Sequence, residues 1–223
     1  MKTANLIVAM LLTSVGMFAQ SVQGTKPLEG KTINVIGDSY ARNHRRPYTE
    51  TWHYKAAVAL GMSCNNYGRN GGCIAFDRTR EGFGPSLLQR YKEMTDTADY
   101  VLVIAGHNDA DRVHANADSL RMVRDSLDAL CQGLIHKYPR AKIAFVTPWA
   151  VPRPGFKEVT AIIKEVCAEH SIPVLDAAAT SGIHVRDEQF RRLYFQAPGD
   201  TAHLNDAGHD LLVRWGMAFI LGL

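Results

Sequence analysis

Residues 32–39 have the sequence TINVIGDS, in which a strand pattern from Thr32 to Ile36 runs directly into Gly37-Asp38-Ser39. β-Branched apolar residues favour a buried strand, and glycine and aspartate are typical of the turn that ends one. The segment therefore predicts a first strand over 32–36, with Ser39 just beyond its carboxyl end.

The alternation of strand and helix patterns continues along the rest of the chain. Strand patterns cover 62–65, 100–105, 141–146 and 172–175, and helical patterns cover 48–60, 85–94, 120–135, 157–170 and 206–220, with an irregular stretch over 177–199. This order predicts an α/β fold with three layers, α/β/α, built on a mostly parallel five-stranded sheet. Ligands bind beyond the carboxyl ends of such strands, where the polar and glycine-rich segments of this chain fall.

The composition is that of a globular protein. Of the 223 residues, 46% are hydrophobic and 21% are charged, and the length suits one domain. We expect that domain over 32–223, after a lead segment over 20–31. The net charge of +3, about +2 without Lys2, is too small to indicate a nucleic-acid partner. The sequence carries no signal for an oligomeric state.

The N-terminal segment differs from the rest of the chain. Lys2 precedes an apolar run over 6–18, and Ala19 is a small residue before a polar stretch. This pattern predicts a secretory signal peptide over 1–19, and hence a secreted or periplasmic protein. The run is shorter than the roughly 20 residues that span a membrane, so no stable membrane anchor is expected. The alternatives are a buried N-terminal helix and an uncleaved anchor.

Four cysteines, Cys64, Cys73, Cys131 and Cys167, lie beyond this segment. Export permits disulfides, and the short separation of Cys64 and Cys73 favours that pair. Other pairings and four free thiols remain open. The cysteine spacings match no common zinc pattern, and we expect neither a metal nor a cofactor.

The serine after the first strand needs a base to become a nucleophile, because a free hydroxyl is weakly nucleophilic. His203 is the favoured base, since it ends the segment Asp200-Thr201-Ala202-His203 before the last helix pattern. A single turn would bring Asp200 to His203, as a serine–histidine–acid triad requires. Acyl transfer also needs donors for the oxyanion. Candidates are the backbone N–H of Ser39, a backbone N–H of the glycine turn over 66–72, and the side chain of Asn108.

On these residues the chain resembles the SGNH hydrolases, the family of GDSL-type esterases and lipases. The matching blocks are Gly37-Asp38-Ser39, Asn66-Tyr67-Gly68-Arg69-Asn70-Gly71, Gly106-His107-Asn108-Asp109 and Asp200-Thr201-Ala202-His203. The resemblance implies a flavodoxin-like fold and a carboxylic ester hydrolase. It implies Ser39 as nucleophile, His203 as base and Asp200 as acid. It also implies oxyanion donors at Ser39, Gly71 and Asn108, with Gly72 as a near alternative to Gly71. Tyr40 departs from the leucine in the family name.

The sequence leaves three alternatives to a serine esterase. A metallophosphoesterase is disfavoured, because its Asp-x-His start and Gly-His-x-His finish are missing and the chain has Ala207-Gly208-His209-Asp210 instead. A lipase, lysophospholipase or thioesterase of the same family is an alternative. So is a catalytically silent carbohydrate-binding protein, although the set of catalytic residue types is complete.

The substrate is expected to be a small-molecule or carbohydrate ester. The chain shows no long apolar lid for a fatty acyl chain, which together with export favours an acetyl group on a carbohydrate. Four arginines near the site, Arg42, Arg45, Arg46 and Arg69, form either a solvated basic face or a subsite for a carboxylate or an acidic sugar. Trp149 follows the fourth strand and either stacks on a sugar or packs in its loop. Expected substrate contacts are Asp38, Arg69, Gly72, His107 and Trp149.

Overall fold

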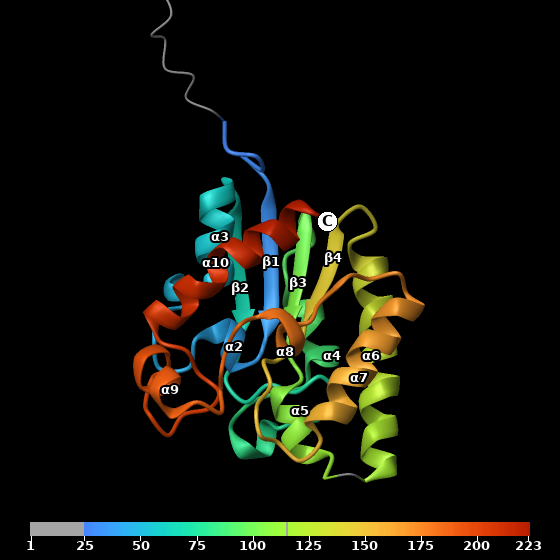
Figure 1. The fold of residues 1–223 in the computed structure, drawn as a ribbon. Coiled ribbons are helices and arrows are strands. Elements are labelled where there is room, and N and C mark those ends of the chain that lie inside the picture. The colour runs from blue at the N-terminus through green and yellow to red at the C-terminus, as the bar shows by residue number, and fades with distance from the viewer. Residues whose placement is uncertain (1–24, 115) are drawn as a thin grey trace, which may run out of the picture.

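The structure, a computed structural model, describes residues 25–114 and 116–223 (Figure 1). Its centre is a five-stranded sheet in the order β2-β1-β3-β4-β5, and every neighbouring pair of strands is parallel. The strands are β1 (Thr32–Gly37), β2 (Ser63–Gly68), β3 (Tyr100–Ile104), β4 (Lys142–Val146) and β5 (Val174–Leu175). The predicted parallel five-stranded sheet is confirmed. The predicted signal peptide, 1–19, lies outside the described residues.

Helices connect the strands and cover both faces of the sheet (Figure 1). They are α2 (Ser39–Arg42), α3 (Trp52–Leu60), α4 (Leu87–Arg90), α5 (His107–Arg112), α6 (Ala117–Lys137), α7 (Phe156–Glu169), α8 (Ala177–Thr180), α9 (Glu188–Tyr194) and α10 (Asp206–Leu221), with short 3-10 helices at Tyr48–Glu50, Thr79–Glu81 and Tyr91–Glu93. No helix within the described residues is long and apolar enough to cross a membrane.

Two hydrophobic cores lie on opposite faces of the sheet. Along β1, Val35 points into the core beneath α3 and α10, whereas Ile36 points into the core beneath α4, α6 and α7. The alternation follows from the two-residue period of a strand. Helices on both sides bury both faces, which is why the central strands are almost continuously apolar. The carboxyl ends of the strands are thereby fixed against each other and carry the loops described below.

The second strand is longer than the sequence pattern predicted. It continues through Asn65 and Asn66 to Gly68, because these two polar side chains find partners inside the fold. Asn65 donates to the Asn34 side chain at 2.9 Å, and Asn66 donates to the Ala41 carbonyl at 2.7 Å. A polar residue in a buried strand is tolerated when its hydrogen bonds are satisfied.

The helical predictions also need correction at several places. The helix predicted over 48–60 begins only at Trp52, because Thr51 is extended and its hydroxyl donates to the Tyr48 carbonyl at 2.6 Å. The segment 85–94 holds only the short α4 and a 3-10 turn, and the stretch over 177–199, expected to be irregular, contains α8 and α9.

The favoured disulfide is not present, because Cys64 and Cys73 are both free thiols, as are Cys131 and Cys167. Cys64 lies near the start of β2, and the strand continues to Gly68. At roughly 3.3 Å per residue, that strand alone spans about 13 Å. A disulfide joins Cα atoms less than about 7 Å apart. Cys73 lies beyond the turn that follows this strand, and no disulfide joins it to Cys64.

Candidate active site

Ser39 lies at the point where β1 ends and α2 begins. The chain can turn here because Gly37 has no side chain, and a Cβ at this position would lie 2.1 Å from the Ile104 carbonyl oxygen. Asp38 caps the short helix, with its carboxylate accepting from the Tyr40 N–H at 2.8 Å. Ser39 is thereby the first helical residue, and its hydroxyl faces the edge of the sheet where the other candidate groups gather.

His203 and Asp200 meet Ser39 from the loop before α10. The Nε2 atom of His203 lies 3.0 Å from the Ser39 Oγ, and its Nδ1 atom lies 2.9 Å from the Asp200 Oδ2. The Asp200 carboxylate also accepts from the backbone N–H groups of Ala202 and His203. Burial acts to raise the pKa of Asp200, but these hydrogen bonds outweigh it and lower the pKa to about 2. The carboxylate therefore stays ionised and fixes the imidazole toward Ser39.

Gly71 and Gly72, the two candidate donors in the turn after β2, differ in whether their backbone N–H is free. The Gly72 N–H already donates to the Arg69 carbonyl at 3.1 Å. The N–H groups of Gly71 and Ser39 have no backbone acceptor among the residues described in the structure. Gly71 has φ +71, and a Cβ there would lie 2.3 Å from the Phe83 ring, so only glycine fits this position. Gly71 is thus the glycine with a free N–H.

Asn108 and Asp109 hold this turn from the start of α5. The Asn108 side chain donates one N–H to the Gly72 carbonyl at 3.0 Å, which leaves its second N–H available. The buried Asp109 carboxylate accepts from the N–H groups of Ile74 and Ala75. Burial raises the pKa of Asp109 to about 6 despite these bonds. Two consecutive residues therefore set the position of the glycine turn.

A buried arginine joins the turn to the first strand. Arg90, which is 2% exposed, donates to the Tyr67 carbonyl at 2.9 Å and to the Gly37 carbonyl at 3.0 Å. These carbonyls stand at the ends of β2 and β1. No sequence pattern predicts this role of Arg90, because its partners are backbone atoms of other elements.

Three of the expected substrate contacts lie beneath the site rather than on its surface. Asp38 is fully buried, and its role is the helix cap. Trp149 is 3% exposed and stacks on Tyr40, with ring centroids 4.0 Å apart. The Tyr40 hydroxyl is hydrogen-bonded to the Nδ1 atom of the buried His107 at 3.0 Å. Arg69 is exposed and pairs with Glu93 at 2.7 Å.

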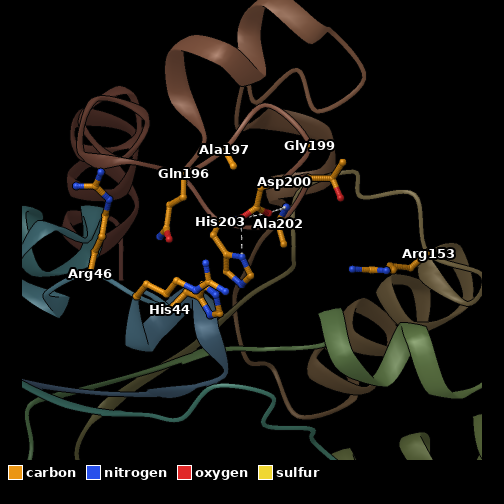
Figure 2. A pocket seen from close by; sticks show the side chains of 11 residues that line it. His44, Arg46, Arg153, Gln196, Ala197, Gly199, Asp200, Ala202 and His203 are labelled. Atoms are coloured by element: carbon orange, nitrogen blue, oxygen red, sulfur yellow. Dashed lines mark hydrogen bonds and ion pairs between the residues drawn. The ribbon is translucent and has the colours of Figure 1, made fainter.

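A cleft of about 670 Å³ opens beside His203 and Asp200. Figure 2 shows that its walls come from three distant segments, with Arg153 on one side of His203 and Arg46 on the other. The lining residues are His44, Arg45, Arg46, Arg153, Gln196, Ala197, Gly199, Asp200, Thr201, Ala202 and His203. Sequence reasoning found Arg45 and Arg46 but missed His44 and Arg153. No local sequence pattern marks either residue. The loop that carries Arg153 reaches the site only because of the order of the strands in the sheet.

Metal-binding arrangements are not found in the part of the chain that the structure describes, where no group of three or more histidine, cysteine or acidic side chains is placed to hold an ion. His209, which a metallophosphoesterase would use as a ligand, is buried. It accepts from the Trp52 N–H at 3.3 Å and contacts the Asn43 side chain at 3.2 Å. Its role is to join α10 to the end of α2.

Comparisons with known proteins bear on the family and the fold. The sequence model described as "GDSL-like Lipase/Acylhydrolase family" matches residues 35–211. No curated protein matches the chain.

Solved structures share the fold at low sequence identity. A protein from Lactobacillus plantarum has a TM-score of 0.72 at 21% identity, covering 87% of this chain and 98% of its own. An acetylxylan esterase from Geobacillus stearothermophilus has a TM-score of 0.61 at 20% identity, with coverages of 89% and 97%. A lipase/acylhydrolase from Enterococcus faecalis has a TM-score of 0.62 at 20% identity, with coverages of 86% and 96%.

Proposed function

The chain belongs to the GDSL-like lipase/acylhydrolase family and is an ester-bond hydrolase, and we propose that it works as a secreted serine esterase that removes short acyl groups, above all acetyl, from carbohydrates. One observation carries the catalytic part of the proposal. The hydrogen bonds from Ser39 to His203 and from His203 to Asp200 form a continuous chain, at 3.0 and 2.9 Å. The catalytic roles are Ser39 as nucleophile, His203 as base and Asp200 as the acid that orients it.

The reaction follows from this arrangement. The Ser39 hydroxyl attacks the ester carbonyl while the Nε2 atom of His203 takes its proton. Asp200 accepts from the Nδ1–H and stabilises the imidazolium that forms. The negative charge on the former carbonyl oxygen is met by the free N–H groups of Ser39, Gly71 and Asn108. His203 then gives the proton to the leaving alcohol. Water, activated by the same imidazole, hydrolyses the acyl-enzyme and releases the acid.

The preference for a small acyl group on a carbohydrate has two supports. The cleft beside the nucleophile is lined mainly by polar and charged side chains, which suit a sugar better than a fatty acyl chain. One structural neighbour is an acetylxylan esterase. The proposal of secretion depends on the charged, apolar and small-residue pattern over 1–19.

The test is a series of p-nitrophenyl esters of increasing acyl length, followed by acetylated xylo-oligosaccharides. We expect kcat/KM to be highest for the acetyl ester and acetate to be released from the oligosaccharides. A maximum at long acyl chains would favour a lipase instead. Secretion is tested by expressing the full chain in an exporting host, where the N-terminus of the extracellular protein should follow residue 19.

A further inference from the structure

The cleft beside His203 concentrates positive charge next to the nucleophile. It is lined by three guanidinium groups, those of Arg45, Arg46 and Arg153, and by one carboxylate, Asp200. Asp200 is already committed to His203 and to two backbone N–H groups. The cleft therefore carries net positive charge in front of the catalytic base.

The cleft arginines have long ion pairs, or none within the described residues. Arg46 lies 3.5 Å from Glu50, and Arg153 lies 3.5 Å from Asp111. No ion pair of Arg45 is found in the described part of the chain. Two exposed arginines outside the cleft pair more closely, Arg121 with Asp118 at 2.6 Å and Arg69 with Glu93 at 2.7 Å. The guanidinium donors of the cleft are thus largely available to a ligand.

Arg153 also lies close to the reacting groups. Burial, and then the positive charge of Arg153, lower the pKa of His107 to about 4. His107 follows the third strand and contacts Tyr40 directly beneath the site. In Figure 2 the Arg153 side chain extends toward His203 from the side opposite Arg46. A ligand group between these arginines would lie beside the scissile bond.

The position of the cleft identifies the part of the substrate it receives. His203 must protonate the leaving oxygen, so the alcohol part of the ester departs on the His203 side. The acyl carbonyl oxygen points the other way, toward Gly71 and Asn108. The residues that line the cleft with His203 therefore contact the alcohol part, whereas the acyl group lies outside it.

We propose that this cleft binds a carboxylate on the alcohol part of the substrate, as in an O-acetylated uronic acid unit of an acidic polysaccharide. The planar fork of arginine matches a carboxylate in two parallel hydrogen bonds, and arginines on both sides of one cleft suit such a group. The inference depends on the proposed esterase function and specifies its substrate. A solvated basic face would attract an anionic sugar only weakly and through its total charge, whereas a subsite depends on particular arginines.

The experiment compares two O-acetylated methyl glycosides, one of glucuronic acid and one of glucose, which differ only in the carboxylate. We expect the native protein to prefer the glucuronoside by about tenfold or more in kcat/KM, the gain of one charge-assisted contact. The ratio should fall toward one in Arg153→Gln and in the double variant Arg45→Gln/Arg46→Gln. The ratio should be unchanged in Arg121→Gln, which removes one positive charge from α6, outside the cleft. Added salt should also reduce the ratio.

Equal kcat/KM for the two glycosides in the native protein would overturn the carboxylate subsite and leave the esterase function standing. If neither ester is hydrolysed, binding decides the question separately. Unacetylated methyl glucuronoside and methyl glucoside are then titrated into the Ser39→Ala protein and followed by calorimetry. Tighter binding of the glucuronoside, lost in Arg153→Gln, would support the subsite, and equal binding would overturn it.

Discussion

The imidazole of His44 stacks on that of His203, with ring centroids 4.2 Å apart and planes inclined by 14°. His44 has φ +36, a conformation that side-chain-bearing residues rarely adopt. Burial, and then the charges of His203 and Arg45, lower the pKa of His44. This lowered pKa favours the neutral form of His44, and the stacked ring restricts how far the His203 ring can tilt from Ser39.

Removal of this stack should slow the reaction. We expect His44→Ala to lower kcat for p-nitrophenyl acetate by about fivefold, the equivalent of ~1 kcal/mol of aromatic contact. His44→Phe restores a flat ring and should recover most of that loss. If the two variants have the same kcat, the stacked ring does not position His203.

Replacement of the nucleophile should leave the fold intact and abolish turnover. For Ser39→Ala we expect kcat to fall by about 10⁴-fold or more, as when other serine nucleophiles are removed. Ser63→Ala, at the exposed start of β2, is the matched control and should keep full activity. A serine-directed sulfonyl fluoride should add mass to the native protein and to Ser63→Ala but not to Ser39→Ala. Labelling of Ser39→Ala would contradict the assignment.

Replacement of Asn108 should lower kcat more than it changes KM. Asn108→Ala removes a proposed oxyanion donor, and loss of one such donor typically lowers kcat about 10²- to 10³-fold. KM should change little, since the charge is absent from the ground state. Asn108→Asp keeps the size of the side chain but presents negative charge, and should be at least as inactive. A loss confined to KM would assign Asn108 to binding.

Because Asp38 is buried, we expect the free energy of unfolding to fall as the pH rises. Burial raises the pKa of Asp38 to about 7, and its Oδ2 has no hydrogen-bond partner in the described structure. The proton is therefore bound more tightly in the folded state. Protonation of Asp38 therefore stabilises the folded state fully below about pH 4. This stabilisation is lost as the pH rises through about 7.

The variant Asp38→Asn isolates this effect, because asparagine caps a helix about as well as aspartate and does not titrate. Urea unfolding of both proteins between pH 4 and pH 8 should show the variant gaining stability relative to the native protein, by up to about 1.4 kcal/mol per pH unit between 4 and 7. Parallel stability curves would show that Asp38 does not titrate in this range.

The central strands and the three catalytic candidates could be predicted because their signals are local. An apolar run such as Tyr100–Ile104 indicates a buried strand by itself, and Asp200 and His203 share one turn. The end of β2 and the absent disulfide could not be predicted in this way. They depend on the partners that Asn65 and Asn66 find in other elements.

The residues that line the cleft were harder still to predict from local sequence patterns. His44 and Arg153 stand more than a hundred positions apart in the sequence, and only the packed sheet brings them to the same cleft. α5 was missed for a related reason. Gly106, with φ +113, is a signal of a turn, but here it precedes a short helix.

Asn108 donates to the carbonyl of Gly72, and Gly72 adjoins Gly71, so the two proposed oxyanion donors are joined by this hydrogen bond. The spacing of the two donors is therefore set by one side chain rather than by the distance between two strands. In the sheet β1 lies between β2 and β3, so this hydrogen bond joins two loops whose strands are not neighbours. The proposed oxyanion site is thus held together by a contact outside the sheet.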